Sequence, residues 1–142
     1  VTLVEIGTTN RTTLDDYARA ITPGTGAIVK VHRSNFTMTG FVAEVPVSTL
    51  ATLGREHALP VIHDFGSGLL VDLGPWGLHG EPTAREAVAS GADVVIMSGD
   101  KLLGGPQCGI VLGTREAIGR LRQHPLARAL RVDKLTLAAL EA

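Results

Sequence analysis

Short apolar segments alternate with segments of helical pattern along this chain, and this alternation restricts the fold more than any other feature. The predicted strands cover residues 1–6, 27–31, 61–63, 93–97 and 109–113. The predicted helices cover residues 14–21, 48–57, 83–91 and 115–123, and a final helix follows Pro125. Strands joined by crossover helices pair in parallel. The sequence therefore predicts an α/β fold, a mostly parallel sheet with helices on both faces.

The segment 109–113 is the exception, because it follows the strand 93–97 after only a short loop with no helix. Parallel neighbours need a long crossover, whereas antiparallel neighbours can be joined by a short one. We therefore expect this last strand to run antiparallel. Two helix starts carry capping residues: Thr13, and the Thr83-to-Glu86 run with the form of a capping box.

Composition excludes several classes of protein. The chain has 142 residues, 44% of them hydrophobic and 19% charged, with a formal net charge of −1. This near neutrality gives no sign of a nucleic-acid surface. No apolar run reaches the roughly 20 residues that a membrane helix needs. The single cysteine, Cys108, excludes an internal disulfide and is typical of a protein in the reducing cytoplasm.

The two ends of the sequence indicate a piece of a longer protein. The chain begins without methionine inside a predicted strand and stops inside the helical pattern 135–142, with no glycine or proline stop signal. Domains normally begin and end in exposed linkers. We expect residues 1–142 to form part of one large domain, with N-terminal and C-terminal regions missing.

The apolar strand 94–97 leads into Ser98, Gly99 and Asp100, and Lys101 follows at once. A lysine at the end of a buried strand is costly unless it is paired or neutralised. Schiff-base chemistry requires such a lysine, because the amine must be deprotonated to attack a carbonyl. The alternative is an ordinary surface lysine in a turn.

A second strand ends in Asp64, followed by the Phe65–Gly68 run. In open α/β sheets, ligands lie beyond the carboxyl ends of the strands, where both Asp64 and Lys101 are expected. A lysine together with a carboxylate for a pyridinium nitrogen is the pair that pyridoxal 5′-phosphate requires. Ser98 and nearby backbone amides could hold the phosphate. Asp64 alone is also compatible with a turn cap or a magnesium ligand.

The histidines and arginines offer further candidates. The five histidines have no metal-ligand spacing. His32, at the end of its strand, is either a cofactor contact in the same crevice or a structural residue. His63 is expected on the opposite sheet face as a packing residue. Arg128 and Arg131 are three positions apart in a helical pattern, so we expect both side chains on one face of a helix. The two guanidinium groups either bind an oxyanion together or form an ordinary solvated basic face.

Five runs of sequence together resemble the bacterial selenocysteine synthase family, the L-seryl-tRNA(Sec) selenium transferases. These runs are EIGTTNRT at 5–12, VHRSNF at 31–36, HDFGSG at 63–68, SGDKLLGGPQ at 98–107 and LRVDKLT at 130–136. The resemblance implies the large domain of a fold-type-I pyridoxal-phosphate-dependent transferase, in a cytoplasmic homo-oligomer.

The resemblance also implies roles for individual residues. Lys101 would carry the cofactor, Asp64 would pair with the pyridine nitrogen and Ser98 would lie near the phosphate. Asp100 matches an acidic residue with a catalytic part. Arg128 and Arg131 match arginines that hold the anionic selenium donor.

The implied reaction converts seryl-tRNA(Sec) into selenocysteinyl-tRNA(Sec). The seryl hydroxyl would leave as water, and selenophosphate would supply selenium to the β-carbon. Two alternatives stay open, a related lyase that acts on a small amino acid or amino-sugar acid, and a catalytically silent scaffold. We expect the 142-residue piece alone to be inactive, because much of the cofactor pocket would lie outside it.

Overall fold

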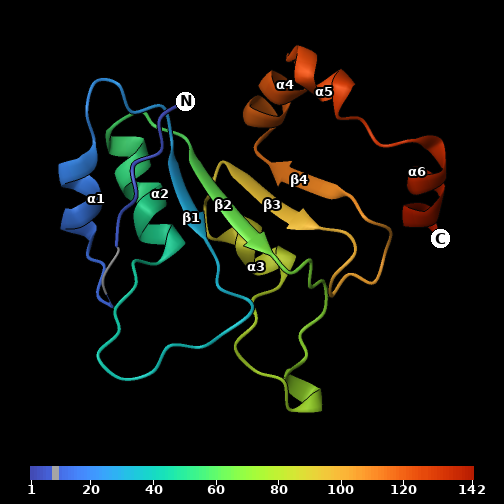
Figure 1. Ribbon diagram of the computed structural model, residues 1–142, viewed down its shortest axis with the longest axis horizontal. Coiled ribbons are helices and arrows are strands. Elements are labelled where there is room, and N and C mark those ends of the chain that lie inside the picture. The colour runs from blue at the N-terminus through green and yellow to red at the C-terminus, as the bar shows by residue number, and fades with distance from the viewer. Residues whose placement is uncertain (8–9) are drawn as a thin grey trace.

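A computed structural model describes residues 1–7 and 10–142 of the chain. At its centre is a four-stranded sheet in the order β1-β2-β3-β4 (Figure 1). The strands are β1 (Ile28–Val31), β2 (Val61–Gly66), β3 (Val94–Ser98) and β4 (Gly109–Gly113). β1, β2 and β3 are parallel, whereas β4 is antiparallel to β3. The predicted α/β class, mostly parallel sheet and reversed last strand are confirmed.

Six α-helices and one short 3-10 helix surround the described part of the sheet. They are α1 (Leu14–Ala20), α2 (Val47–Glu56), η1 (Gly74–Trp76), α3 (Ala84–Ala89), α4 (Arg115–Gln123), α5 (Pro125–Ala129) and α6 (Lys134–Glu141). The expected capping box at α3 is present, since Thr83 N donates to Glu86 Oε2 at 2.7 Å and Glu86 N donates to Thr83 Oγ1 at 3.2 Å. These bonds from Thr83 lower the pKa of Glu86.

The prediction of one final helix after Pro125 is wrong, because two helices occupy that region. α5 ends at Ala129, and Asp133 begins α6 by accepting a hydrogen bond from Thr136 N at 2.8 Å. An aspartate in this position satisfies one of the free N–H groups of a new helix. The capping residue therefore divides the segment.

The strand predicted at residues 1–6 is also wrong. Residues 1–7 have no regular secondary structure, and Val1, Leu3 and Val4 are exposed. An apolar pattern makes a strand only where a neighbouring strand takes up its backbone hydrogen bonds. Among the described residues, the nearest ladder contact is one isolated parallel bridge between Arg11 and Ala43.

The core lies on one face of the sheet, where α2 and α3 pack. Along β2 the side chains alternate, so Val61, His63 and Phe65 are buried while Ile62 and Asp64 are only partly buried. In Figure 1, α3 lies behind β2 and β3. The opposite face leaves three valines 45–60% exposed: Val29, Val31 and Val111. Within the described chain, the expected helix cover is therefore found on one face.

No helix in the described residues is both long enough and apolar enough to cross a membrane.

Candidate active site

Asp64 lies on the sheet face opposite the core. It pairs in register with Val31 of β1 on one side and Ile96 of β3 on the other. β2 continues past Asp64 to Gly66. The register then shifts between Asp64 and Gly66. This irregularity re-aims the end of the strand. Asp64 thus keeps a partly exposed carboxylate next to a distorted strand end.

Gly66 is the point where Asp64 and Lys101 meet. It has a φ of +73°, and a Cβ built on it would lie 3.7 Å from Asp64 Oδ1 and 3.8 Å from Lys101 Nζ. An L side chain rarely adopts this φ, so glycine is favoured here. The structure therefore brings the predicted carboxylate, on β2, and the predicted amine, in the loop after β3, close to the same glycine.

The loop 99–108 holds Lys101 through backbone hydrogen bonds. Leu102 N donates to Ser67 O at 2.9 Å, which ties the loop to the residue after Gly66. Gly104 N donates to Lys101 O at 3.0 Å and closes a tight turn. At the base of the loop, Gly99 N donates to Cys108 O at 2.9 Å. The exposed Lys101 side chain thus projects from a well-bonded backbone.

Two further glycines allow the backbones around the site to touch. A Cβ on Gly68, whose φ is +73°, would lie 2.3 Å from Ser98 O. A Cβ on Gly99 would lie 2.5 Å from Cys108 Sγ. Real Cβ atoms do not approach this closely, so the contacts depend on glycine. Through Gly68, the segment after β2 packs directly on the end of β3, where the partly buried Ser98 lies.

His32 lies beside Asp64 but is held by a residue that the sequence did not reveal. His32 N donates to Asp64 O at 2.8 Å. The His32 ring nitrogen Nε2 lies 3.0 Å from Glu81 Oε2. Glu81 is 49 residues away along the chain in an irregular loop, so no local spacing signals the pair.

His63 is buried, with 6% of its surface exposed, and its ring packs at 6.3 Å from that of Phe65. Burial lowers the pKa of His63, and the positive charges of His32 and Lys30 lower it further. A neutral buried ring is what a packing residue requires. The prediction for His63 is confirmed.

Arg128 and Arg131 do not share a helical face. α5 ends at Ala129, so Arg128 is in its last turn and Arg131 lies beyond the helix. The backbone explains this end, since Leu130 N donates to Leu126 O at 2.9 Å and closes the last turn. Both arginines are exposed. Asp100, beside Lys101, is exposed as well.

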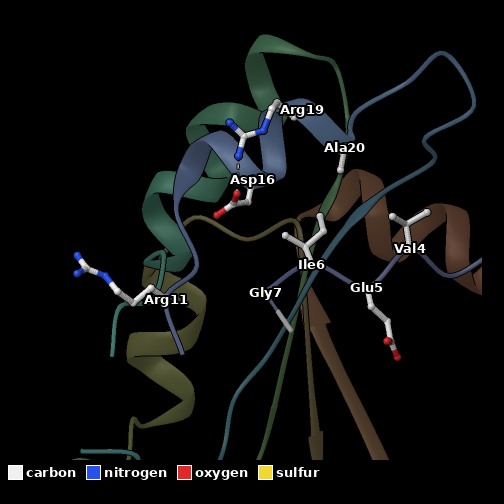
Figure 2. Close-up of a pocket in the computed structure, with 8 residues that line it drawn as sticks. All are labelled: Val4, Glu5, Ile6, Gly7, Arg11, Asp16, Arg19 and Ala20. Atoms are coloured by element: carbon white, nitrogen blue, oxygen red, sulfur yellow. Dashed lines mark hydrogen bonds and ion pairs between the residues drawn. The ribbon is translucent and has the colours of Figure 1, made fainter. Parts of the chain in front are cut away.

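A separate pocket of about 310 Å³ lies against α1 (Figure 2). Its lining includes none of the predicted site residues and consists of Val4, Glu5, Ile6, Gly7, Arg11, Asp16, Arg19 and Ala20. Within it, Arg19 Nη2 lies 2.6 Å from Asp16 Oδ1. The pocket takes in part of the family-like run 5–12, of which Thr8 and Thr9 lie outside the described residues.

The edge of the sheet has the groups that pyridoxal phosphate requires. An amine and a carboxylate both lie within 4 Å of the position that a Cβ on Gly66 would take. The Ser98 hydroxyl is at the same edge, at the end of β3. A donor set of amine, carboxylate and hydroxyl matches the aldehyde, ring nitrogen and phosphate of this cofactor.

Solved structures define the class of the fold. The chain matches the structure of D-glucosaminate-6-phosphate ammonia-lyase with a TM-score of 0.70 and 26% identity, over 96% of this chain and 33% of that one. It matches a Thermus thermophilus aspartate aminotransferase mutant with a TM-score of 0.57 and 24% identity, over 91% of this chain and 32% of that one. The fold is that of the fold-type-I pyridoxal-phosphate-dependent enzymes.

Sequence relatives then identify the family. The family model described as "SelA: L-seryl-tRNA selenium transferase" matches residues 1–142. The chain is 58% identical to the L-seryl-tRNA(Sec) selenium transferase of Geobacter metallireducens over 139 residues, which is 98% of this chain. It is 58% identical to that of Serratia proteamaculans over 140 residues, or 99% of this chain. The chain belongs to the L-seryl-tRNA selenium transferase family, and it spans about 30% of the length of these curated relatives.

Proposed function

We propose that the protein containing this chain converts seryl-tRNA(Sec) into selenocysteinyl-tRNA(Sec), with selenophosphate as donor and pyridoxal 5′-phosphate as cofactor. The observation that carries the proposal is the convergence of Asp64 Oδ1 and Lys101 Nζ at Gly66, in a chain of this family. We assign the protein to the cytoplasm and to a homo-oligomer, as the resemblance implies.

Pyridoxal phosphate, when bound, supplies an electrophilic aldehyde and a ring that withdraws electrons from the substrate Cα. Lys101 would hold the aldehyde carbon and, once displaced by the seryl amine, take the proton from Cα. Asp64 would keep the ring nitrogen protonated, because a carboxylate favours the charged form of a neighbouring base. Ser98 would donate its hydroxyl to the phosphate.

Three residues would serve the remaining steps. Asp100 directly precedes Lys101, and its carboxyl group would donate the proton with which the seryl hydroxyl leaves as water. Arg128 and Arg131 would bind the anionic oxygens of selenophosphate through charge-assisted hydrogen bonds. Their exposure is compatible with a donor site completed by residues outside this chain.

One alternative has a specific observation in its favour. The likeness to D-glucosaminate-6-phosphate ammonia-lyase, at a TM-score of 0.70, supports a lyase that acts on a small amino-sugar acid. Such an enzyme needs the same amine and carboxylate but no tRNA. The identity of 58% to selenium transferases over nearly the whole chain favours the first proposal.

The test uses the full-length protein with pyridoxal phosphate, selenophosphate and charged seryl-tRNA(Sec). We expect formation of selenocysteinyl-tRNA(Sec), complete loss of it in Lys101→Ala, and normal activity in Lys134→Ala, which removes an exposed lysine of α6. Turnover of free serine or amino-sugar acids without any reaction of seryl-tRNA would replace the proposal by the lyase alternative. Absence of cofactor binding would favour the silent scaffold.

The isolated 142-residue chain should not turn over substrate. It spans about 30% of the length of its curated relatives, so most of the protein surface available to the substrates would be missing. A direct check is to run the same assay with residues 1–142 and with the full-length protein at equal concentration.

A further inference from the structure

The carboxylate of Glu81 forms a close pair with the ring of His32. Glu81 Oε2 lies 3.0 Å from His32 Nε2, and the two side chains are only 22% and 24% exposed. A largely buried carboxylate fixes a neighbouring imidazole strongly, because water screens the interaction little. The contact is made by Nε2, so Glu81 holds that side of the ring.

The pair is adjacent to the candidate active site. His32 N donates to Asp64 O at 2.8 Å, so the residue that carries the imidazole is bonded to the residue whose carboxylate reaches Gly66. On the other side, Glu81 stands two residues before Thr83, the N-cap of α3. The pair therefore connects the end of β1, beside Asp64, to the loop that leads into α3.

The two carboxylate oxygens of Glu81 have different surroundings. Glu81 Oε1 is buried and has no hydrogen-bond partner among the described residues. Burying an unsatisfied carboxylate oxygen is unfavourable, so such a group in a native protein calls for an explanation. Within the described residues, the hydrogen bond that this side chain makes is the one to His32.

We propose that Glu81 is a positioning residue that holds the His32 ring in one orientation at the end of β1, beside Asp64. The inference rests on the proposed function, because it assigns His32 to cofactor contact. Glu81 acts only through His32 and does not itself touch cofactor or substrate.

The test is a double-mutant cycle in the full-length protein, with the dissociation constant of pyridoxal phosphate measured by absorbance titration. We expect His32→Asn and Glu81→Ala each to raise this constant about tenfold, as for the loss of a charge-assisted bond. The double variant should also be weakened about tenfold, because Glu81 has no effect once the ring is absent. Glu81→Gln should rescue most of the affinity, since its amide oxygen can still accept from Nε2–H.

Glu44→Gln is the matched control. Glu44 is another carboxylate near the same strand, paired with Lys30 at 2.8 Å and with Arg33, and outside the His32 pair. Its substitution should leave the dissociation constant within about twofold. If Glu81→Ala fails to fold, as judged by thermal melting, Glu81→Asp withdraws the carboxylate from Nε2 and serves in the same cycle.

Three results would overturn the inference: wild-type affinity in Glu81→Ala, a roughly hundredfold loss in the double variant, or an equal loss in the Glu44→Gln control. Any of these leaves the proposed function intact, because wild-type protein still binds the cofactor. If wild-type protein itself shows no saturable binding, the proposed function fails and this inference fails with it.

Discussion

The segment 61–108 and the segment 115–142 carry the two halves of the proposed chemistry, but they are built very differently. In the first, Val61 and Phe65 are completely buried, and the side chains of Asp64 and Lys101 both lie beside Gly66. In the second, none of the helices α4, α5 and α6 has a buried residue. In Figure 1, α6 stands at the edge of the molecule, away from the strands.

The difference teaches which part of the site this chain organises by itself. Packing and backbone hydrogen bonds fix the backbone from which the exposed Lys101 and the partly buried Asp64 project, so this chain itself positions both residues. Exposed helices of five to nine residues are marginal without packing, so the arginines need contacts from elsewhere to be held. The residues proposed to bind the cofactor are therefore held by contacts within this chain. The arginines proposed to bind the selenium donor depend on contacts with residues outside it.

The largest expected effect is at Gly68, in the packed segment. Gly68→Ala places a Cβ 2.3 Å from Ser98 O at a φ of +73°, so the segment after β2 must move away from the end of β3. We expect a loss of about 2–4 kcal/mol in the free energy of unfolding. Urea denaturation of the full-length protein measures this. An unchanged midpoint would mean that the segment is not tightly packed.

Arg128→Ala and Arg131→Ala test the exposed segment. Each should lower kcat/KM for selenophosphate about tenfold or more, corresponding to about 1.5–3 kcal/mol for a charge-assisted bond. The cofactor absorbance spectrum should not change, because the packed segment is untouched. Arg122→Ala in α4 is the control and should behave as wild type. Wild-type kinetics in both arginine variants would identify them as solvated charges.

A smaller effect, with a pH signature, is expected at His63 in the core. Burial holds the pKa of His63 below its ordinary value of 6.5, so near pH 6 the unfolded chain binds a proton that the folded chain excludes. The stability contribution is therefore present above pH 6.5 and is lost as the pH falls through the folded pKa.

His63→Gln should flatten this part of the stability curve, measured by denaturation between pH 8 and pH 5. The exposed His57 provides the control, because His57→Gln should leave the slope as it is in wild type. Equal slopes in wild type and His63→Gln would contradict the assignment.

The smallest effect is expected at Gly119, inside α4. A Cβ there would meet no atom within 4 Å, so Gly119→Ala should stabilise the exposed segment by about 0.5–1 kcal/mol. Thermal melting detects the gain. Comparison with Gly68→Ala uses the same substitution in both segments, and opposite signs are expected.

Local signals in the sequence predicted most of the fold. The capping box at Thr83 and the short loop before β4 are features of neighbouring residues, and both predictions hold. Asp133 carried an N-cap signal of the same kind, which would have divided the final helix correctly. The strand prediction for residues 1–6 was wrong, because an apolar pattern does not reveal whether a partner strand exists.

The sequence predicted only those site residues that lie at the ends of predicted strands. Asp64 and Lys101 follow two strands that were predicted to be parallel, which was enough to expect them at the same end of the sheet, although β2 in fact continues to Gly66. Their meeting at Gly66 depends on a register shift in β2, which leaves no pattern in the sequence. The pair of His32 and Glu81 spans 49 residues and an irregular loop, so only the folded chain reveals it.

The central claim is that Lys101 is the residue that carries the cofactor. The most direct measurement adds pyridoxal phosphate to the full-length protein, reduces the adduct with borohydride and maps the labelled peptide by mass spectrometry. The account predicts a pyridoxyl group on Lys101 and none on Lys30, which is paired with Glu44, or on Lys134. Labelling at either of those lysines instead, or no labelling of a well-folded protein, would contradict it.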